Sequence, residues 1–178
     1  VLELADGTVY VLGRDRLLVL TPGGSRLTAV PLDAALVDRP RALAAAAGGG
    51  VWVAGDEIVV RLDGDGRTQE RRPVAAGRVR AMLEHPAGVL WLGAKRGLFH
   101  AEAGGAFQQH TAVAGEVRVL LPARRGGLWI GSAAGLLLRH QGRMDRFTHE
   151  QGLGDDRISA LYEDREDNLW ICLLYTSD

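Results

Sequence analysis

The side chains that could perform chemistry in this chain of 178 residues are few and scattered. Cys172 is the only cysteine, so the sequence offers one thiol and no internal disulfide. None of the five histidines stands four residues from another or beside a cysteine, as zinc ligands would. Ser132 lies in GSAAG, which departs from the G-x-S-x-G pattern of hydrolase nucleophiles. We therefore expect no catalytic residue, no metal and no cofactor.

The run DGDG is the best candidate for a cation site. Asp63 and Asp65 could supply oxygen ligands to calcium, but the remaining acidic positions of a calcium loop are absent. Asp-Gly pairs between strands are typical of hairpin turns. We interpret the run as a turn and keep a calcium site as the alternative.

The overall charge excludes some partners. The chain has 21 Lys and Arg against 22 Asp and Glu, a net charge of −1. This balance creates no field that would attract nucleic acid or an anionic membrane. The least charged stretch, residues 42–55, is shorter than the roughly 20 apolar residues of a membrane span and contains glycines. We expect neither a nucleic-acid partner nor a membrane span in this sequence.

One aromatic position recurs along the chain at nearly equal intervals. The four tryptophans are separated by 39, 38 and 41 residues, and a tyrosine stands 42 residues before the first of them. An apolar residue precedes each aromatic by nine positions. These matches indicate a repeat of about forty residues. The five aromatic positions are Tyr10, Trp52, Trp91, Trp129 and Trp170.

Each unit consists of four short apolar-rich runs. Around Trp91 they are VRAMLEH (79–85), VLWLG (89–93), LFHAEA (98–103) and AFQQHT (106–111), separated by turn sequences. No run sustains the spacing of an amphipathic helix. Four strands in about forty residues predict an all-β fold in which each unit is one blade of a β-propeller. We expect the five aromatic residues to be structural, filling the space between neighbouring sheets, with the glycine that follows permitting close approach.

Two segments resemble a known family. The runs ISALYEDREDNLWI (158–171) and LWIGSAAGLLLRHQG (128–142) resemble the two-component regulator propeller repeat. The resemblance is strong over residues 78–171 and weaker over 1–77. It implies the periplasmic sensor region of a bacterial receptor, a two-component histidine kinase or a diguanylate cyclase. It also implies partners in the parent protein, namely further blades, downstream domains and a second copy in a homodimer.

The family's strand order suggests where a ligand would bind. Propeller ligands meet the loops at one end of the central channel, here the loops that join strands two and three and those that join consecutive blades. Their arginines and carboxylates suit sugar hydroxyls or uronic-acid carboxylates. The candidate ligand-binding residues are Arg14, Asp15, Arg16, Asp56, Glu57, Arg78, Lys95, Arg96, Asp155, Asp156 and Arg157. The same loops also contain Asp38, Arg39, Arg41, Glu116, Arg118 and Ser132.

The resulting hypothesis is a non-catalytic ligand-sensing module that binds an oligosaccharide or another small ligand. One alternative is a propeller enzyme, a lyase or glycosidase, which would need histidines or carboxylates projecting from several blades. Another is a scaffold for protein partners.

The ends of the chain depart from the repeat. Val1 aligns with Leu161, inside a first strand, so we expect residues 1–171 to form a propeller fragment, an open arc of about four four-stranded blades. Cys172 stands where Gly93 and Gly131 stand, and no turn residue follows it. The string CLLYTSD is similar to translated adapter sequence. We interpret residues 172–178 as a non-native tail.

Overall fold

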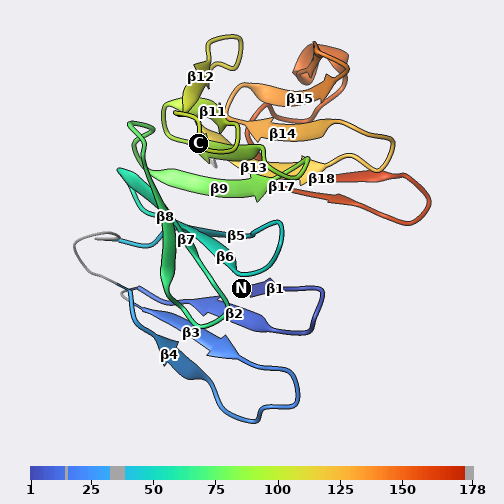
Figure 1. Ribbon diagram of the computed structural model, residues 1–178. Helices are drawn as coiled ribbons and strands as arrows, with labels where there is room; N and C mark the ends of the chain where they lie inside the picture. The colour runs from blue at the N-terminus through green and yellow to red at the C-terminus, as the bar shows by residue number, and fades with distance from the viewer. Residues whose placement is uncertain (15, 33–38, 175–178) are drawn as a thin grey trace.

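The computed structural model describes residues 1–14, 16–32 and 39–174. Within these ranges the chain forms four four-stranded antiparallel sheets and one two-stranded sheet, each a meander in chain order. Figure 1 shows the sheets stacked one after another along the chain, from β1–β4 to β17–β18. The predicted all-β propeller arc of about four blades is confirmed.

The first two sheets come from the part of the chain in which the repeat is weakest. Blade 1 contains β1 (Leu2–Glu3), β2 (Val9–Leu12), β3 (Leu17–Leu20) and β4 (Thr28–Val30). Blade 2 contains β5 (Ala42–Ala45), β6 (Val51–Ala54), β7 (Ile58–Leu62) and β8 (Thr68–Pro73).

The remaining sheets follow the strong repeat. Blade 3 contains β9 (Val79–Glu84), β10 (Leu90–Ala94), β11 (Gly97–Ala101) and β12 (Gln108–His110), close to the four predicted runs. Blade 4 contains β13 (Val117–Pro122), β14 (Leu128–Ser132), β15 (Gly135–His140) and β16 (Arg143–Phe147). A short 3₁₀ helix, η1 (His149–Gln151), leads to β17 (Ile158–Glu163) and β18 (Leu169–Leu173).

The first strand of each sheet lies on the inner side of the arc. Strand β5 packs against β9, β9 against β13, and β13 against β17, so the first strands of successive blades meet. The second, third and fourth strands follow outward in every complete sheet. The first residues of successive inner strands therefore lie close together, at the same end of the sheets.

The repeated aromatic residues differ in burial along the arc. Tyr10, Trp52 and Trp91 are each 3 % exposed and lie in the apolar cores between blades 1 and 2, blades 2 and 3, and blades 3 and 4. Trp129 is half-buried, whereas Trp170 is 63 % exposed. Trp170 thus departs from the expected core position, because no sheet within the described part of the chain covers the outer face of β17–β18.

No helix among the described residues is long and apolar enough to cross a membrane.

Candidate functional site

The loops predicted to carry a ligand site meet at one end of blades 2 and 3. The turn between β6 and β7 contains Asp56 and Glu57, and the turn between β10 and β11 contains Lys95 and Arg96. The connection from β8 to β9 runs between them. Its Val74 N–H donates to the Glu57 carbonyl (2.8 Å), and its Arg78 carbonyl accepts from the Lys95 N–H (2.9 Å). Backbone hydrogen bonds therefore fix both turns relative to the connection.

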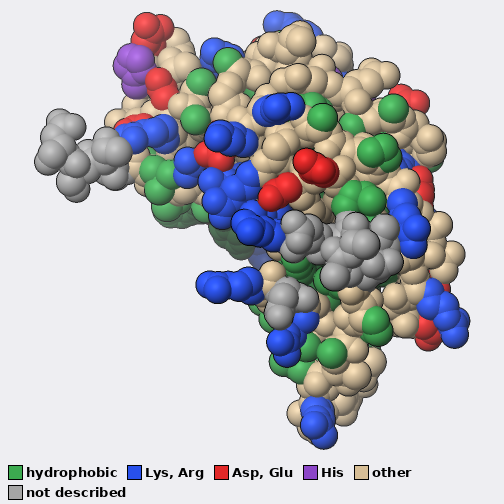
Figure 2. All heavy atoms as spheres, turned by 90° about the vertical axis from the view of Figure 1, so that its left-hand side faces the viewer, with side chains coloured by type: hydrophobic (Ala, Val, Ile, Leu, Met, Phe, Trp, Pro, Cys, Tyr) green, Lys and Arg blue, Asp and Glu red, His purple; other side chains and the backbone are tan. Residues whose placement is uncertain are grey.

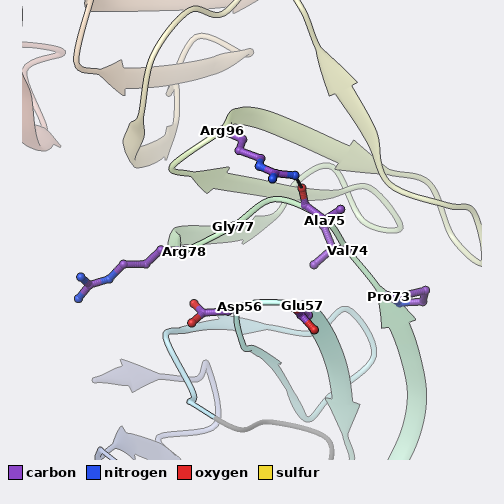
Figure 3. Close-up of a pocket in the computed structure, with 8 residues that line it drawn as sticks. All are labelled: Asp56, Glu57, Pro73, Val74, Ala75, Gly77, Arg78 and Arg96. Carbon is purple, nitrogen blue, oxygen red and sulfur yellow. Dashed lines mark hydrogen bonds between the residues drawn. The ribbon is translucent and has the colours of Figure 1, made fainter.

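A hollow of about 650 Å³ lies between these segments. Four of the predicted residues line it, namely Asp56, Glu57, Arg78 and Arg96, together with the connection around Ala75. In Figure 3 the two carboxylates lie on one side and Arg96 on the other, where its Nη1 donates to the Ala75 carbonyl (3.1 Å). The rest of the lining is Pro73, Val74 and Gly77. The hollow thus offers charged groups of both signs and backbone polar groups.

The carboxylates at this end hold neighbouring arginines in place. Asp56 accepts two hydrogen bonds from Arg41, at 3.0 Å to Nε and 3.1 Å to Nη2, and this pairing raises the pKa of Arg41. Among the described residues, Arg78 forms no ion pair, and in Figure 3 its side chain extends away from the other labelled side chains. Arg78 is therefore a cation that a ligand could bind without breaking an existing contact.

A second charged group links blades 3 and 4 at the same end. Glu116 accepts from Arg80 Nε (2.8 Å) and pairs with Arg118 Nη2 (2.7 Å). Burial raises the pKa of Glu116, but the two arginines outweigh it and hold the pKa below its usual value. Glu116 is therefore ionised at neutral pH and fixes two guanidinium groups.

A third charged group precedes β17. Asp155 forms a two-pronged ion pair with Arg157, at 3.1 Å to Nε and 2.9 Å to Nη2, and this contact lowers the pKa of Asp155 to about 2. Asp156 accepts from His149 Nδ1 (2.9 Å), and the contact raises the pKa of His149. These residues belong to the connection into the fifth sheet and do not line the hollow.

The structure also separates some predicted residues from the hollow. Arg14 and Arg16 flank the β2–β3 turn of blade 1, which the Gly13 N–H closes by donating to the Arg16 carbonyl (2.8 Å). Asp15 and Asp38 lie outside the described residues. Ser132 ends β14 and is fully buried, and its hydroxyl donates to the Gly135 carbonyl (2.8 Å). Its side chain therefore stabilises a turn.

The alternative cation site has a different geometry from a calcium loop. The Asp63 carboxylate accepts from the N–H groups of Asp65 (3.0 Å) and Arg67 (2.8 Å) and from Gln69 Nε2 (2.6 Å). The carboxylate therefore organises the turn between β7 and β8. Within the described ranges, no group of three or more His, Cys, Asp or Glu side chains is arranged to hold a metal.

The lone thiol lies in a sheet. Cys172 is exposed and pairs with Ala160 across β17 and β18, and its carbonyl accepts from Ser159 Oγ (3.0 Å). This pairing does not bear on the origin of residues 172–174, and residues 175–178 lie outside the described residues. The non-native tail therefore stays a prediction.

Sequence reasoning placed Arg41 and Arg118 in the loops that join consecutive blades, but it did not name Arg80 or the repeat position that the three share. Arg41, Arg80 and Arg118 each precede the tryptophan of their blade by eleven residues. Alignment of the repeats shows the shared position of these arginines, although the carboxylates that bind them come from different repeat positions. A stack in blade 3 was also not anticipated: the Trp91 ring lies 5.1 Å from that of His100 and 5.3 Å from that of His110.

The comparisons with known proteins agree with this architecture. Residues 152–174 match the family model described as two component regulator propeller, so the resemblance to that family is confirmed for this repeat. No curated protein sequence matches the chain.

Solved structures match over nearly the whole chain. The extracellular domain of a hybrid two component system from B. thetaiotaomicron has a TM-score of 0.72 and 12 % identity, covering 96 % of this chain and 26 % of that one. The extracellular domain of a one component system from the same organism has a TM-score of 0.71 and 16 % identity, covering 96 % and 27 %. A virginiamycin B lyase from Staphylococcus aureus has a TM-score of 0.77 and 13 % identity, covering 94 % and 60 %.

These identities establish the propeller fold alone. This chain spans about a quarter of the two extracellular domains and 60 % of the S. aureus lyase.

Proposed function

We propose that this chain is a non-catalytic, ligand-binding part of the periplasmic sensor propeller of a bacterial signalling receptor, and that it binds an oligosaccharide. The observation that carries the proposal is the hollow of about 650 Å³ beside the β6–β7 and β10–β11 turns of blades 2 and 3. The two component regulator propeller match and the fold shared with extracellular domains of signalling systems support it.

The chemistry of the hollow suits a saccharide. Asp56 and Glu57 can accept hydrogen bonds from hydroxyl groups, and Arg78 and Arg96 can donate them. Charge-assisted hydrogen bonds are stronger than neutral ones, so a few such groups suffice to orient a polar ligand. In this proposal the parent protein also contains further blades and downstream domains, and it pairs with a second copy of itself. A ligand that favoured one arrangement of this assembly over another would shift its population and so signal.

The lyase neighbour supports the enzyme alternative only through its fold. Several charged groups at this end are arranged as ion pairs between arginines and carboxylates, as for Arg41 with Asp56 and Arg80 with Glu116. Among the described residues that line the hollow, Glu57 is the one carboxylate outside these pairs, and no histidine lies beside it as a second acid or base. We therefore favour binding over catalysis.

Calorimetry with a panel of neutral and acidic oligosaccharides tests the proposal. Ala75 is exposed and lines the hollow, so Ala75→Trp should fill the hollow and abolish binding without disturbing the sheets. Ala5→Trp is the matched control, because Ala5 is exposed in the β1–β2 turn at the opposite end. If no saccharide binds, or if both variants bind as well as the parent chain, the proposal is wrong.

A further inference from the structure

Arginines occupy two fixed repeat positions at the start of successive inner strands. Eleven residues before the tryptophan stand Arg41, Arg80 and Arg118, and thirteen residues before it stand Arg39, Arg78 and Arg157. All six lie at the end of the sheets where the hollow lies, and we call them the arginine row. Figure 2 views this end of the molecule and shows Lys and Arg side chains gathered near its centre.

Two members of the arginine row are the extra residues of β-bulges in the inner strands. Val79 and Ala81 pair with consecutive residues of β10, which leaves Arg80 as an extra residue in β9. Arg118 is the extra residue of β13 in the same way. A β-bulge locally breaks the ladder and re-aims the side chain of the extra residue. The same β-bulge in β9 and β13 therefore places guanidinium groups at the same end of the sheets.

The positive charge of the row is only partly neutralised. Asp56 holds Arg41, Glu116 holds both Arg80 and Arg118, and Asp155 holds Arg157. Arg39 and Arg78 are exposed and form no ion pair within the described part of the chain. Arg118 Nε is buried and has no hydrogen-bond acceptor among the described residues. Four of the six guanidinium groups thus share three carboxylates, two are in no ion pair, and one buried donor stays unsatisfied.

The opposite end of the sheets carries charges of both signs. Its turns contain Asp6, Asp63, Asp65 and Asp164, but also Arg67, Arg124, Arg125 and Arg165. Arg67 pairs with Asp65 and Arg125 with Asp167. The arginine row is therefore distinguished by its two unpaired cations, because a local excess of one sign raises the local concentration of ligands of the other sign.

We propose that the arginine row binds an acidic oligosaccharide, whose carboxylate or sulfate groups contact Arg78 and Arg39 while the chain of sugars lies over the hollow. This inference rests on the proposed function and specifies its ligand class. The arginines fixed by Asp56 and Glu116 supply a positive field, and the two unpaired arginines supply direct hydrogen bonds. Planar guanidinium groups match the geometry of both kinds of anion.

Paired ligands test the charge requirement. Calorimetry would compare hexagalacturonate and a sulfated hexasaccharide with maltohexaose, in buffers of rising ionic strength. We expect the acidic oligosaccharides to bind more tightly and their affinity to fall with salt, because screening weakens exposed charge pairs. If maltohexaose binds equally well, the proposed function survives and the acidic ligand class is wrong. If no saccharide binds, both are wrong.

Matched variants test the site. Arg78→Gln should weaken binding of the acidic hexamer roughly tenfold, as expected for loss of a charge-assisted hydrogen bond, and Arg39→Gln should weaken it similarly. Arg143→Gln is the control, because the Arg143 side chain is 85 % exposed on the outer strand β16. Equal losses in all three variants would overturn the site, as would tighter binding of a duplex DNA or of free galacturonate than of the hexamer.

Discussion

The glycines two residues after Trp91 and Trp129 lie against the inner strand of the next blade. A Cβ atom added to Gly93 would lie 2.6 Å from Val117 Cγ1, and one added to Gly131 would lie 2.6 Å from Ile158 Cγ2. Val117 and Ile158 are fully buried and β-branched, so they have little freedom to move aside. These glycines therefore set how closely neighbouring sheets approach.

Gly131→Ala should destabilise the chain. The added methyl group would collide with Val119 and Ile158, and overpacking of this kind typically costs about 1–3 kcal/mol. Urea unfolding followed by tryptophan fluorescence would measure the loss. Gly64→Ala is the matched control, because nothing lies within 4 Å of its added Cβ atom. An unchanged midpoint for Gly131→Ala would show that the blades separate easily at this point.

Neighbouring blades are also joined by a carboxylate at the end of the inner strand. Glu84, the last residue of β9, accepts from the Ala47 N–H (2.9 Å) and the Trp52 indole (2.7 Å) of blade 2. Glu163 takes the same place in β17 and accepts from the Arg124 N–H (2.9 Å) of blade 4. Blade 4 has Pro122 at this position, and there the Trp91 indole donates to the His85 carbonyl within its own blade (2.7 Å). The carboxylate contact therefore connects some pairs of sheets and not others.

Glu84→Gln should weaken the contact between blades 2 and 3 in a pH-dependent way. Burial raises the pKa of Glu84, but hydrogen bonds from Ala47, Gly88 and the Trp52 indole outweigh it, so the pKa lies below the usual 4.5. A lowered pKa in the folded state means that the carboxylate stabilises the fold above pH 4.5 and that this stability disappears as the pH falls through the folded-state value.

Thermal melts at several pH values would test this expectation. At pH 7 the variant should lose about 1–2 kcal/mol, the usual size for a hydrogen bond to a charged group that is replaced by a neutral one. The gap to the parent chain should close towards pH 3. Glu102→Gln serves as the control, because the Glu102 side chain is exposed. A gap that persisted unchanged at pH 3 would contradict the role of the charge.

At the scale of the whole molecule, the sequence predicted the features that repeat. One aromatic residue in every forty or so positions predicted the number of sheets, the four strands of each and the turns between them, because each blade solves the same packing problem. The resemblance to the family repeat is weaker over residues 1–77, yet the spacing of the aromatic residues identified blades 1 and 2. Local patterns therefore sufficed for the architecture.

The sequence predicted less about contacts between blades. It indicated the loops that carry Asp56, Glu57, Arg78 and Arg96, but it could not show that these four line one hollow. It also gave no sign that Glu84 binds the indole of the preceding blade. Such contacts join residues about thirty positions apart, and their partners follow from how the sheets are placed rather than from strand patterns. Trp170 is the same kind of case, since its burial depends on what covers β17–β18.

The outer face of the β17–β18 sheet predicts how the isolated chain behaves in solution. Tyr162 and Trp170 pair across the two strands and are each 63 % exposed, next to Ala160 and Cys172 on the same face. Trp52 and Trp91 occupy the same repeat position and are buried by the following blade. Exposed apolar sheet faces of this kind promote association. We expect the chain to associate as its concentration rises.

Sedimentation velocity over a range of concentrations would measure this association, and Trp170→Lys should reduce it by placing a charge on the face. Leu27→Lys is the matched control, because Leu27 is 44 % exposed in blade 1, away from this sheet. Acrylamide quenching gives an independent readout: Trp170→Phe should remove most of the quenchable fluorescence, since Trp52 and Trp91 are buried and Trp129 is half-buried. A chain that stays monomeric at all concentrations, with Trp170 protected from acrylamide, would show that this face is covered from within the chain.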